Sequence, residues 1–297
     1  MQNLKRGSKL CISTFFYVLE AFRRWLGLVF GKEPECTCTV LVYHTVSSGE
    51  IPRFSKQMDL LKKLARPVST GQLEHLSERI HHAVVTFDDG FQSLYDNALP
   101  VLLERQIPST VFVPAGCIGC RPSWPDDPGD PNPDEPVMTE SQVRALPAEW
   151  VTVGSHSMTH ADLRALSDDE IAKELVESKE RLESIIDRCV SLFSLPYGGY
   201  DTRVAECIVR AGYQVVFNSS PRPMDRRKDA HMVGRIRVSP SDWEWEFKLK
   251  LLGAYQWLPL AVSLKRKIRA IFSPGRQERR GEVQVAEIGE HGRGDGE

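Results

Sequence analysis

Short apolar runs alternate with stretches of helical periodicity along most of the chain, and this alternation constrains the fold more than any other feature. Six apolar runs, each followed by polar residues, glycine or proline, have the length of strands: 40–43, 83–87, 110–113, 151–153, 191–195 and 213–217. Helical periodicity is clearest between them, at 54–64, 94–103 and 163–186. Strands that alternate with helices predict an α/β fold with a parallel sheet, either open or closed into a barrel.

Length and charge narrow the class of protein. A chain of 297 residues is long enough for one large domain or two small ones with a sizeable core. It contains no run of about 18 apolar residues, which excludes a polytopic membrane protein. The 38 Lys and Arg residues nearly balance the 40 Asp and Glu residues, whereas a dedicated nucleic-acid binder usually carries a strong basic excess. We therefore expect a globular protein of enzyme size with no nucleic-acid partner.

The seven cysteines predict free thiols. An odd number of widely scattered cysteines leaves at least one thiol outside any disulfide framework. Cys117 and Cys120 have the spacing of a redox or zinc pair, but the residues around them are typical of a loop, and Cys36-Thr-Cys38 is a poor second half for a zinc site. We therefore predict a reducing, cytoplasmic compartment, with a loop disulfide as the alternative.

Residues 1–34 form a basic segment with an apolar stripe. The segment contains six Lys or Arg and two Glu, and its apolar residues recur at helical spacing: Phe15, Leu19, Phe22, Leu26, Val29 and Phe30. Its charged start and the apolar stretch 10–19 resemble a signal peptide, but no small-residue cleavage site follows. We predict an amphipathic helix on an anionic membrane surface, which makes the protein peripheral on the inner membrane. The alternatives are a helix that covers the domain's own core and an uncleaved anchor that places the protein in the periplasm.

A second basic segment follows at 239–272. Between 247 and 272 it contains six Lys or Arg, no acidic residue and interleaved apolar residues, which predict another basic amphipathic helix after Pro259. A groove for single-stranded nucleic acid would show the same mixture, but the near-neutral net charge favours a membrane surface. Residues 273–297 are rich in Gly and charged residues and predict a disordered tail.

Two carboxylates and two histidines stand where predicted strands end, which is the usual place for catalytic groups in parallel α/β folds. Asp88-Asp89-Gly90 follows the run 83–87, and a break in the strand at Gly90 would let both carboxylates face one site. His156 and His160 follow the run 151–153 and can converge on one cation through neutral imidazole nitrogens. Each motif alone has another interpretation, since Asp before a helix is a common N-cap and nearby histidines are often incidental.

Three motifs, in this order, resemble the first three motifs of the polysaccharide deacetylase family, the NodB-homology or carbohydrate esterase 4 domain. They are Thr86-Phe87-Asp88-Asp89-Gly90, His156-Ser157-Met158-Thr159-His160 and Pro196-Tyr197-Gly198. The resemblance covers residues 39–238 and implies a distorted (β/α) barrel of the NodB type, here with flanking amphipathic helices. It also implies metal-dependent hydrolysis of N-acetyl groups on a carbohydrate.

By resemblance, the residues of these motifs have separate roles. Asp88 is the general base, and Asp89, His156 and His160 bind the metal. The backbone N–H of Tyr197 helps to hold the oxyanion. A site of two histidines and one carboxylate suits Zn²⁺, but Co²⁺, Ni²⁺, Mn²⁺ and Fe²⁺ accept the same ligands.

The chain departs from the family pattern at two positions. The family's arginine two residues before the proline of the third motif, which orients the base, is Ser194 here. The late Leu-x-Leu-His motif, which carries the general acid, is missing, since His231 and His291 are the only histidines past residue 200. Leu41-Val42-Tyr43-His44 resembles instead the permuted arrangement of poly-N-acetylglucosamine deacetylases, in which the acid histidine comes first. Because the first and last strands of a closed barrel are neighbours, we predict that His44 reaches the site; the alternative is a histidine hydrogen-bonded to the backbone.

Together these features predict a metal-dependent N-deacetylase that acts on an N-acetylated sugar or glycan, and the two basic flanks suggest a lipid-linked one. The alternatives among hydrolases are a sugar deformylase and an O-acetyl esterase, because nothing in the sequence separates these acyl groups. The alternative of another class is a non-catalytic carbohydrate-binding protein, prompted by Ser194 and the displaced acid. The intact set of Asp88, Asp89, His156 and His160 favours the enzyme.

Overall fold

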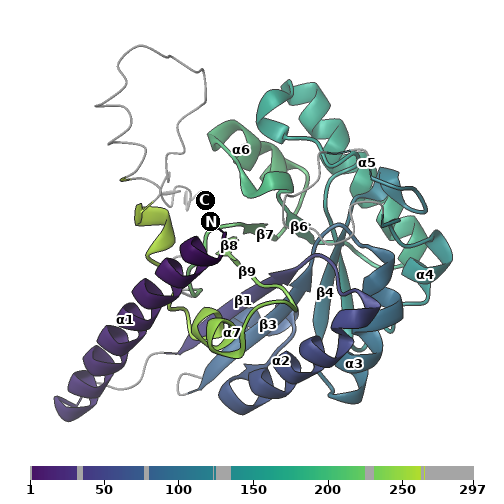
Figure 1. Ribbon diagram of the computed structural model, residues 1–297. Coiled ribbons are helices and arrows are strands. Elements are labelled where there is room, and N and C mark those ends of the chain that lie inside the picture. Colours follow the sequence, from purple (N-terminus) through teal and green to yellow (C-terminus); the bar gives the residue numbers. More distant parts are fainter. Residues whose placement is uncertain are drawn as a thin grey trace, which may run out of the picture.

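The strands form one parallel sheet that curves into a nearly closed barrel, with helices packed around it (Figure 1). The computed structural model describes residues 2–31, 36–76, 80–122, 124, 135–224, 231–261 and 264. The strands in this part of the chain are β1 (Thr37–Tyr43), β2 (Arg66–Pro67), β3 (His81–Phe87), β4 (Ser109–Val113), β5 (Val151–Ser155), β6 (Leu192–Ser194), β7 (Val215–Asn218), β8 (Met232–Gly234) and β9 (Ile236–Arg237). Their order in the sheet is β8-β7-β6-β5-β4-β3-β1-β9, with β2 paired to β3. The predicted distorted (β/α) barrel is confirmed.

One extended segment around residue 235 closes the barrel. β8 and β9 stand at the two ends of the strand order, yet Arg235 is the single residue that separates them in the chain. The N–H of Arg235 donates to the carbonyl of Asn218 in β7 at 3.1 Å, and the N–H of Val238 donates to the carbonyl of Val42 in β1 at 3.0 Å. The same segment therefore bonds to both edges of the sheet, which removes the exposed edges that an open sheet would have.

Side chains on the two faces of the sheet form separate cores, because successive residues of a strand point to opposite faces. The outward face, which includes Phe87, packs against the helices and belongs to the larger apolar cluster. The inward face is filled by a smaller cluster that includes Val84 and Phe112. Gly154 is required on β5, because a Cβ at this position would lie 2.6 Å from the ring of Phe112. Along β3 the inward positions run from Val84 to Asp88, so polar groups begin at the C-terminal end of the strand.

The helices begin where local capping signals place them. Their bounds are α1 (Gln2–Val29), α2 (Ile51–Leu64), α3 (Leu99–Glu104), α4 (Glu140–Arg144), α5 (Asp168–Ile186), α6 (Thr202–Arg210) and α7 (Glu244–Leu251). At the start of α5, the Ser167 hydroxyl accepts the N–H of Glu170, and the Glu170 carboxylate accepts the N–H of Ser167 at 2.8 Å. The predicted helix 163–186 therefore starts later than expected, because Asp162 caps a separate short turn at Leu163–Ala165.

All six predicted strands are present, within three residues at each end. The three strands that were not predicted are β2, β8 and β9, each of two or three residues. Such segments are too short to show a periodicity in the sequence, and only their pairing identifies them as strands.

The N-terminal segment forms α1, which packs on α7 beside the barrel (Figure 1). No helix in the described part of the chain is long and apolar enough to cross a membrane. α7 precedes the second predicted amphipathic helix, most of which lies outside the described residues, as does the predicted tail 273–297. The seven cysteines all lie in the described part of the chain, and no disulfide joins any two of them.

Candidate metal and catalytic site

The predicted site residues meet at the C-terminal ends of four strands. His44 directly follows β1, Asp88 follows β3, His156 follows β5, and Ser194 is the last residue of β6. The C-terminal end of a parallel barrel is where loops of different strands converge, and catalytic groups of such folds are found there. The barrel therefore brings together residues that are spread over more than half of the chain.

The strand break predicted at Asp88-Asp89-Gly90 is present. Asp88 still belongs to the sheet, since its N–H donates to the carbonyl of Tyr43 in β1 at 3.0 Å. Asp89 and Gly90 then turn the chain with φ of 65° and 59°. The left-handed conformation is unfavourable for an aspartate and marks a position that the surrounding structure enforces. This turn lets two adjacent carboxylates serve one site, which a continuous strand would not allow.

The loop after β5 carries the two histidines and is held from outside by α5. The backbone N–H groups of Met158 and Thr159 both donate to the Glu174 carboxylate at 2.9 Å. Inside the loop, the N–H of His160 donates to the hydroxyl of Ser157 at 3.0 Å. Ser157 and His160 both have positive φ, 65° and 61°. The helix therefore fixes a tight turn that returns the second histidine to the end of the strand.

Asp89, His156 and His160 fit a divalent metal ion. All three are buried, and their ligand atoms lie within 4.8 Å of one another. The Oδ1 atom of Asp89 is 3.6 Å from Nε2 of His156 and 3.3 Å from Nε2 of His160. Burial lowers the pKa of both histidines, so they are neutral at pH 7, the form that binds a metal. One carboxylate and two imidazoles suit Zn²⁺ and the neighbouring divalent transition metals.

His156 is also held from behind in the orientation that a ligand needs. Its Nδ1 lies 2.8 Å from the carbonyl oxygen of Ser194, which can only accept a hydrogen bond. Nδ1 therefore carries the proton, and Nε2 presents a lone pair toward Asp89. Metal-ligating histidines usually have a partner of this kind on the other ring nitrogen.

A buried arginine that the sequence analysis missed holds Asp88. Arg235 is 1% exposed, and its Nη1 and Nη2 donate to Oδ1 and Oδ2 of Asp88, both at 2.7 Å. The hydroxyl of Ser194 donates to Oδ1 of Asp88 at 3.2 Å and accepts from Nη2 of Arg235 at 2.7 Å. Burial alone would raise the pKa of Asp88, but the charge and hydrogen bonds of Arg235 outweigh it and hold this pKa well below its usual range. Asp88 is therefore a buried, ionised carboxylate with a fixed orientation.

Arg235 resolves the first departure from the family pattern. Position 194 contacts Asp88 with a serine hydroxyl, and the guanidinium comes instead from the segment that closes the barrel. One signal in the sequence pointed to it: two arginines, Arg235 and Arg237, follow Val233 at positions that alternation places on the inward face. A charge in such a position needs a buried partner.

His44 lies in the same site, as predicted from the neighbouring first and last strands. β1 pairs with β9 on one side and with β3 on the other, so the end of β1 stands beside Asp88. Burial lowers the pKa of His44 to about 4, although Asp88 opposes the shift. Its Nδ1 is buried and makes no hydrogen bond to any described residue, which disfavours the alternative of a histidine bound to the backbone through that atom.

Two aromatic residues flank His160. The ring of Tyr197 lies 4.9 Å from the imidazole, edge to face, and Tyr197 is half exposed with φ of 59°. The ring of Trp124 is stacked on the imidazole of His160, with 4.3 Å between the ring centroids. Trp124 lies in the segment between β4 and α4, of which residues 123 and 125–134 lie outside the described part of the chain. Sequence reasoning did not assign Trp124 to the site, because a lone tryptophan in a loop carries no spacing signal.

Comparisons with known proteins agree with this geometry. Residues 77–216 match the family model described as polysaccharide deacetylase. The protein YxkH of Bacillus subtilis (strain 168) is 25% identical over 215 residues, covering 68% of this chain and 71% of YxkH. A chitooligosaccharide deacetylase of Rhizobium leguminosarum bv. trifolii is 29% identical over 144 residues, covering 48% of this chain and 59% of the relative. The structure of IcaB from Ammonifex degensii superimposes with a TM-score of 0.60 and 26% identity, covering 73% of this chain and 99% of IcaB.

Proposed function

Since this chain carries a polysaccharide deacetylase domain of the NodB type, we propose that it is a metal-dependent hydrolase that removes N-acetyl groups from an N-acetylated sugar or glycan. The observation that carries the proposal is the division of labour between adjacent carboxylates. Asp88 is held ionised by Arg235, while Asp89 faces two neutral histidines. Hydrolysis of an amide by water requires a general base next to a group of metal ligands, and this site offers both.

The residues would act in this order. Asp89, His156 and His160 would hold a divalent cation, which when bound polarises the acetamide carbonyl and lowers the pKa of water. Asp88 takes the proton of the attacking water, and Arg235 keeps its carboxylate in place. The backbone N–H of Tyr197 donates to the oxyanion. His44 donates a proton to the departing amine, which is otherwise a poor leaving group.

The substrate we propose is an oligosaccharide that contains N-acetylated amino sugars, because the Rhizobium relative is a chitooligosaccharide deacetylase. A lipid-linked form of such a glycan, at the cytoplasmic surface of a membrane, is our proposal for its setting and rests on the basic flanks of the domain. The direct test is acetate release from N-acetylglucosamine oligosaccharides by zinc-loaded protein. Formate release from N-formyl sugars, or acetate release from O-acetyl sugars alone, would instead identify the deformylase or the esterase.

Removing one metal ligand should remove the metal. We expect His156→Ala and Asp89→Asn to lose bound zinc after dialysis, because each leaves two of the three donor side chains. The measurement is metal content per chain by elemental analysis, with His75→Ala, an exposed histidine outside the site, as the matched control. Full metal content in both ligand variants would show that the ion binds elsewhere.

The acid role of His44 can be separated from a structural role by the choice of leaving group. We expect His44→Gln to lower kcat for the N-acetyl sugar by about 10²–10⁴-fold, the usual contribution of a general acid. An aryl acetate expels a stable phenolate that needs no proton, so its hydrolysis should fall much less. Equal losses on both substrates, at unchanged metal content, would contradict the assignment.

The low pKa of His44 means that it must become protonated before it can act as the general acid. At about 4, the pKa leaves His44 neutral at pH 7 before substrate binds. It can become protonated when negative charge develops on the tetrahedral oxyanion, because a nearby negative charge raises a histidine pKa. The proton that His44 delivers to the amine is therefore taken up from solvent as the oxyanion forms, and the proton held by Asp88 returns to solvent after the products leave.

A further inference from the structure

The first helix exposes an unusual amount of apolar surface. Of the seventeen large hydrophobic side chains that are exposed in the described part of the chain, nine lie between residues 12 and 30. Their exposure ranges from 41% to 78%. They are Ile12, Phe15, Val18, Leu19, Phe22, Trp25, Leu28, Val29 and Phe30. Monomeric soluble proteins rarely expose a contiguous apolar patch of more than a few hundred Å² without a partner for it.

These side chains form one continuous stripe along the helix. At about 3.6 residues per turn, residues seven apart lie nearly in line. Phe15, Phe22 and Val29 therefore follow a line along α1, with Leu19 and Trp25 beside it. We call these five residues the outer α1 face.

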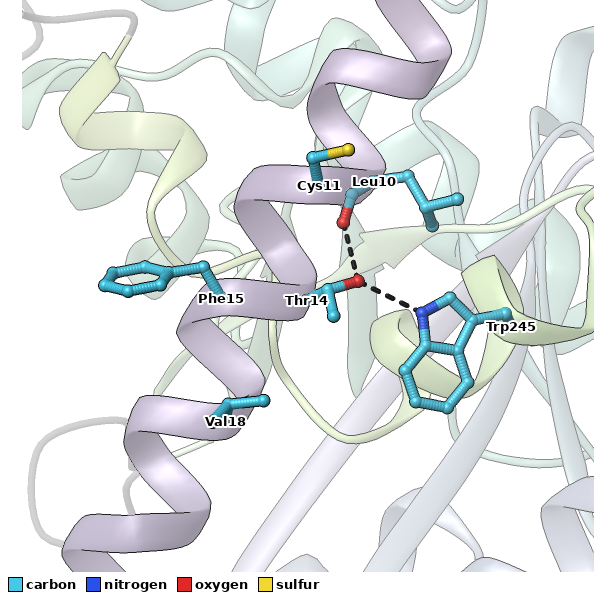
Figure 2. A pocket seen from close by; sticks show the side chains of 6 residues that line it. All are labelled: Leu10, Cys11, Thr14, Phe15, Val18 and Trp245. Atoms are coloured by element: carbon cyan, nitrogen blue, oxygen red, sulfur yellow. Dashed lines mark hydrogen bonds between the residues drawn. The ribbon is translucent and has the colours of Figure 1, made fainter.

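The opposite side of α1 is the one that binds the protein. Arg6 donates to the Glu246 carboxylate of α7 at 2.6 Å, and the indole N–H of Trp245 donates to the Thr14 hydroxyl at 3.0 Å. Figure 2 shows Thr14 facing Trp245, while Phe15 points away from it. The inward side of α1 also has its own apolar contacts, since Leu10 and Tyr17 pack on the cluster of Leu249, Ala254 and Tyr255. α1 therefore has apolar residues on both sides, and the outer side is the one that stays exposed in the described part of the chain. The predicted stripe itself faces outward, whereas the alternative of a helix that covers the domain describes the inward side of α1.

The apolar surface continues from the helix onto the domain. A groove of about 460 Å³ runs between α1 and α7 and is lined by Leu10, Cys11, Thr14, Phe15, Val18 and Trp245 (Figure 2). The groove adjoins the stripe, because Phe15 and Val18 belong to both.

Charge identifies the partner of this surface. Among the side chains of residues 6–31, the cations are Arg6, Lys9, Arg23 and Arg24, and Glu20 is the acidic residue. Lys9, Arg23 and Arg24 are exposed, whereas Arg6 is engaged with α7. Arg23 lies beside the stripe and donates to Glu20 at 3.0 Å, and Arg24 lies on the side of the helix opposite to Phe15. A helix with an apolar face, aromatic residues and flanking cations is the pattern of segments that lie in the interface of an anionic bilayer.

We propose that the outer α1 face inserts into the interfacial region of an anionic lipid bilayer, with α7 holding the helix in this orientation. The contacts of Arg6 and Thr14 with α7 make the face a preformed part of the fold. This proposal identifies the surface that would contact a membrane and does not depend on the deacetylase activity.

Binding of full-length protein to vesicles tests the proposal. Wild-type protein should co-sediment with vesicles of phosphatidylcholine and phosphatidylglycerol, and salt should weaken the binding. Phe22→Ser/Trp25→Ser should bind at least about tenfold more weakly, because two aromatic side chains no longer leave water. The matched control is Val176→Ser/Val209→Ser, which removes two exposed hydrophobic side chains elsewhere on the surface and should bind like wild type.

The contribution of the arginine charges is measured separately, by comparing anionic with neutral vesicles. Arg23→Gln/Arg24→Gln should lose affinity for the anionic vesicles but not for vesicles of phosphatidylcholine alone. All variants should keep the wild-type melting temperature and the wild-type rate on a soluble oligosaccharide, since none of the substituted residues belongs to the catalytic site. A failure of catalysis in every protein would therefore leave the vesicle result interpretable.

Two outcomes would overturn the proposal. The first is wild-type protein that ignores anionic vesicles. The second is a wild-type dimer in solution that Phe22→Ser/Trp25→Ser converts to a monomer, with no difference in vesicle binding, since this face would then be an interface between two copies of the chain.

Discussion

Asp88→Asn should lower kcat/KM for acetate release by about 10²–10⁴-fold, which is the usual contribution of a general base. The side chain keeps its size and an oxygen that Arg235 can contact, but it no longer accepts the proton of the attacking water. Asp89, His156 and His160 remain, so bound zinc should stay at the wild-type level. The measurement combines initial rates on N-acetylglucosamine oligosaccharides with metal analysis of the same protein.

Two controls make this result specific. The Asp88→Asn substitution leaves the guanidinium of Arg235 without its anion, so folding must be checked by thermal unfolding before the rates are compared. Asp201→Asn provides a matched substitution at an N-cap away from the site and should keep the wild-type rate. A folded, zinc-loaded Asp88→Asn protein with the wild-type rate would mean that another group is the base.

Arg235→Met should destabilise the protein by about 3–5 kcal/mol at pH 7, because it leaves a buried carboxylate without its partner. The loss should depend on pH in a defined direction. In the wild type the pKa of Asp88 lies below its unfolded value of about 3.9, so the pair stabilises the fold above that pH and loses this stabilisation as pH falls. In the variant, burial without Arg235 should raise the pKa of Asp88 above the unfolded value. At low pH the side chain of Asp88 is then protonated and neutral, which the buried site tolerates. The loss in free energy of unfolding relative to wild type should therefore grow as pH rises through about 4.

Urea unfolding of both proteins between acidic and neutral pH measures this difference, provided that the slopes with denaturant stay equal. The double variant Arg235→Met/Asp88→Asn should recover much of the stability, since it buries no unpaired charge. Arg235 also lies over the rings of Phe112 and Phe217, at 5.4 and 5.8 Å from their centroids. If the loss of stability were equal at every pH and unchanged in the double variant, the stabilisation by Arg235 would come from these packing contacts and not from the ion pair.

The same substitution should also reduce the rate at pH 7, because an Asp88 with a raised pKa is partly protonated and free to rotate. Arg235→Lys keeps the charge but cannot make two parallel hydrogen bonds to one carboxylate. It should therefore restore stability more fully than activity. This contrast separates charge compensation from the orientation of the base.

Arg235 shows that an arginine can contact the same carboxylate from a different position in the sequence. The family places the arginine two residues before Pro196, but here that residue is Ser194, and a segment 147 residues away from Asp88 supplies the guanidinium. The closed barrel makes this possible, since the segment of Arg235 lies between β7 and β1, and these strands are the neighbours of β6, which carries Ser194, and of β3, which precedes Asp88. The buried carboxylate of Asp88 requires a cation beside it, and the fold can supply that cation from more than one strand.

Much of the architecture was predictable because its signals are local. The strand 83–87 is an apolar run that ends at Asp-Asp-Gly, and α5 begins at a capping box formed by Ser167 and Glu170. Both depend on a few neighbouring residues, so they can be identified without knowledge of the rest of the chain. The cluster of Asp89, His156 and His160 was also predictable, because these residues lie in motifs that resemble those of a known family.

The sequence by itself determined the six longer strands, the capped helices, the apolar stripe of α1 and, through the family motifs, the candidate metal-binding residues. Only the tertiary structure decided that Arg235 clamps Asp88, that burial leaves His44 neutral, and that the stripe of α1 faces outward. The physical reason is the range of the interactions. Periodicity and caps act within a few residues, whereas burial and ion pairing depend on groups that the barrel brings together from distant parts of the chain.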